Sequence, residues 1–218
     1  MLVGHLAVGF VAKRIVPKLS LGTLMLAAMM ADFLWCAFMI AGIEEVQIKS
    51  GLGAANYFEA TDIFYSHSLL MNAIWAALFA TAYFLRRHCP RGACVVFVAV
   101  LSHWLLDFAS HRPDMPLAPG VHRYFGLGLW TSIPATLILE GGFWLLAIML
   151  YVRATRVKKR AGVYFFWSVI AFVTVAWYNN IAGPPPPNPR AAPIVSLIFF
   201  SLIVAWAYWM NRLRPAED

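Results

Sequence analysis

Three side chains that can bind a metal or move a proton recur every four residues near the middle of the chain: His103, Asp107 and His111. If the segment that contains them is helical, residues four apart lie one above the other on the same face. Imidazole nitrogens and carboxylate oxygens are ligands of zinc and other divalent metals. The spacing therefore predicts metal or proton chemistry on one helix face.

The segment that carries these residues is apolar and long enough to cross a bilayer. It runs from Gly92 to Ser110, close to the ~20 residues that a hydrocarbon core of ~30 Å requires. Ionisable side chains are costly inside a membrane and usually have a function there. His103 and Asp107, one helical turn apart, must share a partner, so chemistry is favoured over packing for this pair.

The composition of the whole chain is that of an integral membrane protein. Of its 218 residues, 61% are hydrophobic and only 12% are charged, and the mean hydropathy is +0.70. Soluble domains are about half apolar and about one quarter charged. We therefore expect an all-α fold, a polytopic bundle of transmembrane helices embedded in a lipid bilayer.

Six segments have the length and hydropathy of a membrane span, and a shorter helix precedes them. The short helix, Leu2–Val16, lacks the polar start and the cleavage site of a signal peptide, so we expect it to be a partly inserted helix of the mature protein. Residues 1–152 are interpreted as a bundle that holds the metal site, and residues 153–218 as a two-span scaffold of the same membrane unit. The six expected spans are Leu19–Ile43, Ser68–Leu85, Gly92–Ser110, Ile133–Val152, Val163–Ile181 and Pro193–Met210.

Basic residues gather at one end of the expected spans. Thirteen of the seventeen lysines and arginines lie there, whereas Lys49, Arg112, Arg123 and Arg190 lie on the opposite side. By the positive-inside rule, both termini are expected in the cytoplasm and the His111 end outside the plasma (inner) membrane. The net charge of +7 follows from the cytoplasmic loops and does not indicate nucleic acid, so anionic lipid is the expected partner.

Four further ionisable residues are expected in the same layer, between the membrane midplane and the outer surface: His5, Asp32, His67 and Glu140. At a rise of ~1.5 Å per residue, His103 lies about 16 Å and Asp32 about 20 Å from the cytoplasmic boundary. Polar residues scattered without a common role would have no reason to share one depth. The layer therefore favours a common site.

Each of these residues also has a structural interpretation. A lone buried histidine such as His5 is more often held by hydrogen bonds than by a metal. Asp32 could pair with a basic group, and His111 could be an interfacial residue at a helix end. Glu140 could hydrogen-bond to a neighbouring helix.

With these residues in view, the chain resembles the YdjM-like family of membrane-bound metal-dependent hydrolases. The resemblance covers about residues 1–150, and the last two expected spans carry no part of it. The segments that carry it are Gly4–His5, Ala31–Asp32, Tyr65–Ser68, Ser102–Asp107 and His111–Asp114. It implies a membrane enzyme whose metal ligands are His5, Asp32, His67, His103, Asp107 and His111.

The order of these ligands is also similar to that of the zinc-dependent phospholipase C and P1-type nuclease group. In that group an aspartate on a helix bridges two zinc ions, and Asp107 would resemble it. The later His-x-x-x-Glu pair that completes the third zinc position in the group is missing from this sequence. The similarity therefore implies one or two zinc ions rather than three.

The function expected from the sequence is metal-dependent hydrolysis of a phosphoester, such as a lipid head group, at the outer face. A divalent metal would acidify a water molecule and polarise the phosphoryl oxygen, and Asp32 or Glu140 would accept the proton of that water. Two other interpretations stay open: a non-enzymatic membrane protein whose polar layer is structural or relays protons, and a metal transporter. The expected ligands of the metal are Asp32, His67, His103 and Asp107, with His5 completing a second position.

Overall fold

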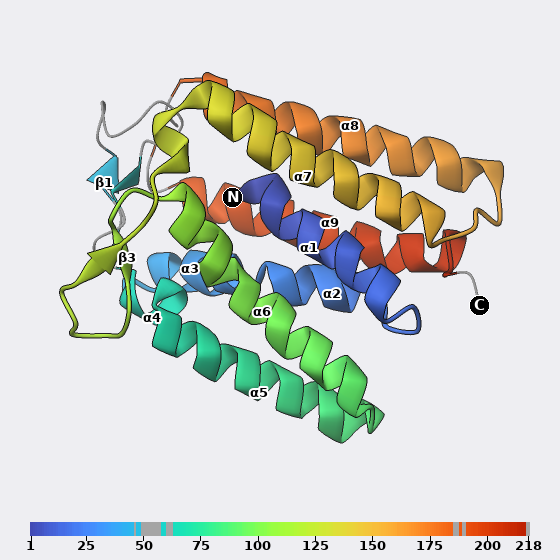
Figure 1. The fold of residues 1–218 in the computed structure, drawn as a ribbon, viewed down its shortest axis with the longest axis horizontal. Helices are drawn as coiled ribbons and strands as arrows, with labels where there is room; N and C mark the ends of the chain where they lie inside the picture. Colours follow the sequence, from blue (N-terminus) through green and yellow to red (C-terminus); the bar gives the residue numbers. More distant parts are fainter. Residues whose placement is uncertain (46, 49–57, 60–62, 185–187, 189–190, 217–218) are drawn as a thin grey trace.

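The chain folds as a bundle of helices in the computed structural model (Figure 1). The structure describes residues 1–45, 47–48, 58–59, 63–184, 188 and 191–216. Two short antiparallel strand pairs lie at one end of the bundle: β1 (Gln47–Ile48) with β2 (Phe58–Glu59), and β3 (Met115–Pro116) with β4 (Tyr124–Phe125). The α-helices of the described residues are α1 (Leu2–Ile15), α2 (Leu21–Ala28), α3 (Met30–Ile40), α4 (Phe64–His67), α5 (Leu69–Arg87), α6 (Pro90–Ser110), α7 (Ile133–Arg153), α8 (Arg160–Ala182) and α9 (Ala192–Leu213), and a 3₁₀ turn, η1 (Leu129–Thr131), precedes α7.

Serines and prolines determine where several helices begin. Ser20, Ser68 and Ser132 are the N-caps of α2, α5 and α7, and each hydroxyl accepts a hydrogen bond from the backbone N–H three residues later. A proline is the first or the second residue of α6, α7 and α9, where its missing N–H removes no helical hydrogen bond. These local signals explain why the long helices begin within a few residues of the expected boundaries.

Five helices of the described residues, α5 to α9, are long and apolar enough to cross a membrane, and they match five of the six expected spans. The remaining expected span, Leu19–Ile43, is two helices, α2 and α3, bent by 58° at Met29. If the bent pair counts as one span, the number of candidate spans is six. The expected fold class is therefore confirmed, with a broken helix in place of a straight first span.

The break in the first span coincides with a hydrogen bond from another helix. Neither proline nor glycine stands at Met29 or beside it. The ring nitrogen Nδ1 of His103, on α6, lies 2.8 Å from the carbonyl oxygen of Ala28, the last residue of α2. A side chain that takes a backbone carbonyl out of the helical ladder is a recognised cause of a sharp kink. The break starts a new helix just before Asp32, which lies in the first turn of α3.

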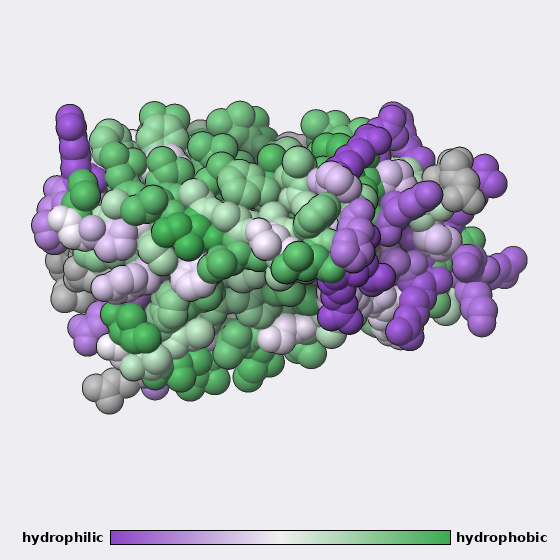
Figure 2. All heavy atoms as spheres, turned by 90° about the horizontal axis from the view of Figure 1, so that it is seen from below, coloured by the Kyte–Doolittle hydropathy of each residue, from purple (hydrophilic) through white to green (hydrophobic). Residues whose placement is uncertain are grey.

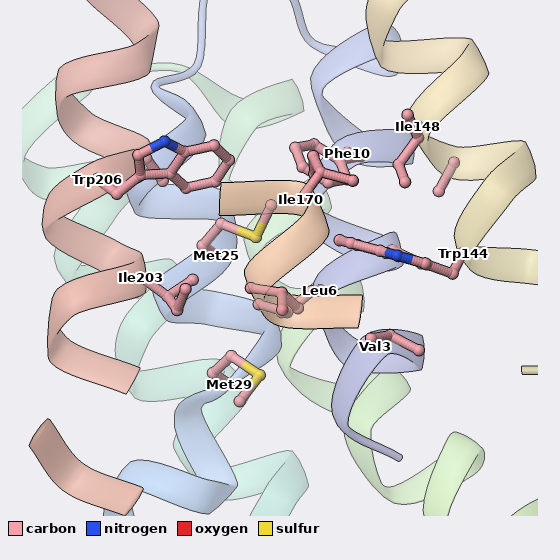
Figure 3. Close-up of a cluster of buried hydrophobic side chains, with 14 of the residues drawn as sticks. Val3, Leu6, Phe10, Met25, Met29, Trp144, Ile148, Ile170, Ile203 and Trp206 are labelled. Atoms are coloured by element: carbon pink, nitrogen blue, oxygen red, sulfur yellow. The ribbon is translucent and has the colours of Figure 1, made fainter. Parts of the chain in front are cut away.

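The short helix α1 lies inside the bundle, beside α7 and α9 in the view of Figure 1. Val3 and Phe10 are fully buried, and Figure 3 shows them next to Trp144 and Ile148 of α7. The ring of Phe10 lies 5.5 Å from that of Trp144 and 6.4 Å from that of Trp206 on α9, measured between centroids. The N-terminal helix is thus part of the core and not an appendage at its edge.

A buried lysine fixes the other end of α1. Lys13 is 2% exposed, and its Nζ donates hydrogen bonds to the carbonyl oxygens of Pro17 and Leu19, both at 2.7 Å. A third bond, also 2.7 Å, goes to the side-chain oxygen of Asn211 on α9. Because α1 is held at this end and along its length, the position of His5 near its beginning is fixed as well.

The main hydrophobic core joins the first and the last parts of the chain. It includes buried residues of α1, α2, α7, α8 and α9, and a second cluster lies between α1, α2, α5 and α6. Tyr151, Phe166 and Met210 from the three C-terminal helices are fully buried in the main core. The proposed division at residues 152 and 153 into a site bundle and a scaffold stays a prediction.

Replacing Phe10 by alanine is expected to destabilise the protein strongly. Buried Phe→Ala changes cost about 3–5 kcal/mol, and we expect the lower part of that range because apolar side chains gain little on transfer from lipid to a protein interior. Thermal unfolding in detergent measures the effect. Phe172→Ala is the matched control, since Phe172 is 60% exposed on α8, and an equal loss in both variants would contradict a core role for Phe10.

The surface has an apolar belt and a basic end. Figure 2 shows hydrophobic residues along most of the molecule and a concentration of hydrophilic residues at one end. Basic residues lie in the last turns of α1, α5, α7 and α9, and all four helices end on that side of the bundle (Figure 1). Helix length and hydropathy therefore identify an integral membrane protein that contacts a lipid bilayer. Its orientation stays a prediction, and Lys49 and Arg190 lie outside the described residues.

Candidate metal centre

Five ionisable side chains from four helices meet in the interior of the bundle. His5 comes from α1, Asp32 from α3, His67 from α4, and His103 and Asp107 from α6. The three histidines and Asp107 are at most 6% exposed, whereas the side chain of Asp32 is 21% exposed. The structure thus brings together five of the residues that the sequence placed in one layer, and Asp32 has the most exposed side chain of the five.

Ligand atoms of four residues approach one another between α3, α4 and α6. Asp32 Oδ1 lies 3.7 Å from both His67 Nε2 and His103 Nε2. Asp107 Oδ2 lies 3.2 Å from His103 Nε2 and 3.8 Å from His67 Nε2. Ligands of a tetrahedral zinc ion, bound at ~2.0–2.1 Å, are about 3.3 Å apart. Asp32, His67 and His103 offer one ligand atom each, and these three atoms all lie within 4.8 Å of one another, so they could hold one ion with a position left for water.

The second carboxylate oxygen of Asp107 faces a different histidine. Asp107 Oδ1 lies 3.1 Å from His5 Nε2, and the α-amino nitrogen of Met1 lies 2.9 Å from the same oxygen. The rings of His5 and His103 are stacked, with centroids 3.6 Å apart and planes within 7°. His5, His103 and Asp107 therefore form a second group of ligand atoms, which shares His103 with the group of Asp32, His67 and His103.

The hydrogen bond that breaks the first span also orients His103. Because Nδ1 faces the carbonyl oxygen of Ala28, which only accepts, Nδ1 carries the proton and donates it. The other nitrogen, Nε2, is then left with its lone pair. This atom is buried and has no hydrogen-bond partner, although two carboxylate oxygens lie within 3.7 Å of it. An unpartnered buried lone pair beside two carboxylates is suited to binding a cation.

His67 is oriented by two residues that sequence reasoning did not assign to the site, Ser66 and Glu44. Ser66 Oγ lies 2.8 Å from His67 Nδ1 and donates a hydrogen bond of 2.6 Å to Glu44 Oε2. Glu44 is only 2% exposed. Ser66 adjoins a ligand and could have been suspected on that ground, but nothing in the sequence connects it with a glutamate 22 residues earlier.

His111, expected as a metal ligand, belongs to neither group of ligand atoms. The helix α6 ends at Ser110, and His111 has extended backbone, φ −68° and ψ 148°. Its side chain therefore leaves the face that His103 and Asp107 share. His111 Nδ1 lies 2.9 Å from Asp114 Oδ1, and its ring packs at 4.6 Å from that of Trp130.

Glu140, expected as a possible proton acceptor, belongs to α7 and lies next to the first turn of α1. It is 1% exposed, and its Oε1 accepts a hydrogen bond of 3.4 Å from the backbone N–H of Gly4. An acidic side chain near the unpaired N–H groups of a helix N-terminus is stabilising. The structure therefore gives Glu140 a helix-stabilising contact one residue from His5, and its catalytic role stays a prediction.

Charge balance also favours a cation in the cluster. The α-amino group of Met1 compensates Oδ1 of Asp107, whereas Asp32 faces His67 and His103, and an uncompensated carboxylate in a protein interior is strongly unfavourable. Neutral histidines supply ligand atoms but no positive charge, whereas a divalent ion would supply two. The buried histidines and aspartates could therefore hold a metal ion, and the ligand atoms alone do not identify it.

Comparisons of the chain with protein-family models, with curated proteins and with solved structures gave no match. The functional argument therefore depends on the geometry of the cluster and on the helical membrane fold that holds it.

Proposed function

We propose that this protein is a membrane-embedded hydrolase that uses one or two divalent metal ions, zinc first among them, to cleave a phosphoester. The observation that carries the proposal is the meeting of ligand atoms from Asp32, His67 and His103 within 4.8 Å of one another, with Asp107 Oδ2 at 3.2 Å from His103 and 3.8 Å from His67. His5 and the second oxygen of Asp107 offer a further position. The fold and the ligand types agree with the YdjM-like resemblance and with the phospholipase C group.

The residues of the cluster have distinct proposed roles. A bound zinc ion would act as a Lewis acid and would lower the pKa of a water molecule bound to it toward ~7. Asp32 is the proposed proton acceptor, because it combines a place in the cluster with a side chain that is 21% exposed. Glu140 is the weaker candidate, because its oxygen already accepts from Gly4. Asp107 holds His5 and His103 in place through its two oxygens.

A lipid head group is the proposed substrate. The cluster lies near the end of α6 that leads into the loop after Ser110, inside a bundle whose spans contact lipid. Arg123 in that loop is exposed, and a guanidinium there would attract an anionic head group. If the basic end is cytoplasmic, as the charge pattern predicts, this loop lies on the outer side.

The test is to measure metal content and hydrolysis in the same preparation. Protein purified in detergent is expected to hold one or two zinc ions per chain by elemental mass spectrometry and to hydrolyse a phospholipid in mixed micelles. His103→Gln should lose both properties. His122→Gln should keep both, because His122 is exposed and contacts Tyr124 and Phe64 instead of the cluster.

The other outcomes separate the competing interpretations. Metal without hydrolysis, together with metal flux into vesicles, would favour a transporter. If the wild-type protein binds no metal and His103→Gln behaves like it, the polar layer is structural or relays protons, and the hydrolase proposal is wrong.

A further inference from the structure

We propose that Glu44 and Ser66 are positioning residues that fix the tautomer of His67, so that its Nε2 lone pair points into the metal centre. The inference rests on the proposed metal function and adds two residues to it. Glu44 follows the end of α3 by four residues, and Ser66 lies within α4. Neither residue touches the other ligand atoms, so both would act only through His67.

The evidence is a short chain of buried hydrogen bonds. Ser66 Oγ lies 2.6 Å from Glu44 Oε2 and 2.8 Å from His67 Nδ1. Ser66 is fully buried, Glu44 is 2% exposed and His67 is 6% exposed. At the far side of the ring, His67 Nε2 lies 3.7 Å from Asp32 and 3.8 Å from Asp107. The imidazole therefore connects the Glu44–Ser66 pair with both carboxylates of the cluster.

The direction of these hydrogen bonds follows from the chemistry of the groups. An ionised carboxylate only accepts, so the Ser66 hydroxyl must donate to Glu44. A hydroxyl has one proton, and Ser66 Oγ can therefore only accept from His67. His67 then carries its proton on Nδ1, and Nε2 has the free lone pair that a metal requires. Carboxylates that orient metal-bound histidines in this way tune both ring position and ligand basicity.

The same glutamate also holds the backbone around His67. Glu44 Oε1 accepts hydrogen bonds from the backbone N–H groups of Tyr65 and Ser66, at 2.8 and 2.9 Å. The side chain of Asn72, on α5, donates to the carbonyl oxygen of Ser66 at 2.9 Å. The four-residue helix α4 is too short to be stable alone. These contacts keep it in place, so the tautomer and the position of His67 have a common support.

The decisive variant is Glu44→Gln, because it keeps the shape of the side chain and reverses one hydrogen bond. The amide oxygen can still accept from Tyr65 and Ser66, whereas the amide nitrogen now donates to Ser66 Oγ. The Ser66 hydroxyl is then free to donate to His67 Nδ1, and the ring proton moves to Nε2. We expect metal affinity to fall about 10- to 100-fold, the usual effect of losing such a support.

Nitrogen-15 NMR of the labelled ring tests the tautomer directly in the metal-free protein. In the wild type, His67 is expected to show a protonated Nδ1 and an unprotonated Nε2, and Glu44→Gln should exchange the two signals. Ser66→Ala removes the acceptor without reversing it and should also weaken metal binding. Ser110→Ala is the matched control, because Ser110 is equally buried but donates to Leu106 within its own helix.

The outcomes distinguish this inference from the proposed function. If the wild type binds metal and Glu44→Gln binds it equally well, with the ring signals unchanged, the positioning role is wrong while the hydrolase proposal stands. If the wild type binds no metal, the proposed function fails, and the ring signals still report whether Glu44 sets the tautomer. A Glu44→Gln protein that unfolds at the wild-type temperature but binds metal weakly supports the inference against a merely structural role.

Discussion

Asp107→Asn is expected to remove all tightly bound metal and to lower hydrolysis more than about a hundredfold. Asp107 is the only residue of the described cluster whose two side-chain oxygens face different histidines, Oδ1 toward His5 and Oδ2 toward His103. Asparagine keeps the shape but replaces one oxygen by an NH₂ group and removes the negative charge. Because the loss of an outer-shell support alone costs 10–100-fold, the loss of a shared direct ligand should cost more.

Elemental mass spectrometry and a phospholipid hydrolysis assay measure this prediction on the same sample. Asp114→Asn is the control, since Asp114 is also 2% exposed and also contacts a histidine, His111 at 2.9 Å, outside the two ligand groups. We expect Asp114→Asn to retain its metal. Equal metal content in wild type and Asp107→Asn would exclude Asp107 as a ligand and would remove the main support for the hydrolase.

The spans could be predicted from the sequence, but the break in the first of them could not. Long apolar runs bounded by serine, proline and basic residues specify α5 to α9 locally, and these helices appear as expected. The bend at Met29 depends on a hydrogen bond from His103, which lies 75 residues after Ala28. A contact between residues so far apart in the sequence is determined by the fold, so no local sequence pattern predicts it.

The site was predictable where spacing on one helix or depth in the membrane decided the outcome. His103 and Asp107 are one turn apart on α6 and face the cluster together. His5, Asp32 and His67 join them from other helices. Glu44 could not be found in this way, because it lies beyond the end of α3 and meets Ser66 only through the folding of the chain.

Spacing alone does not bring His111 to the cluster, because α6 ends one residue before it, and its role as a ligand stays a prediction. The four-residue repeat is valid only while the backbone stays helical, and α6 ends at Ser110. Pro113 follows two residues after His111 and disfavours helical backbone at Arg112. Pro113 therefore predicts that the helix ends before this position, so the four-residue spacing of His103 and Asp107 does not extend to His111. His111 instead contacts Asp114.

His67→Gln and His5→Gln are expected to have unequal effects, although both remove one buried imidazole. His67 Nε2 belongs to the group of ligand atoms that Asp32 and His103 complete. Its loss leaves two ligands in that group, so we expect no tightly bound metal there and no hydrolysis. His5 lies outside that group, and His5→Gln should keep one metal ion per chain.

The contrast between these two variants tests which position fills first. Once an ion occupies the lone pair of His103, the His5 side retains only His5 Nε2 and Asp107 Oδ1 as ligands, and two ligands hold an ion less firmly than three. Cobalt substitution measures the order, because visible absorption reports tetrahedral cobalt and titration gives the number of ions. We expect His5→Gln to retain the first absorbing equivalent and His67→Gln to lose it. The reverse result would place the primary ion between His5, His103 and Asp107, and the centre formed by Asp32, His67 and His103 would then have to be abandoned.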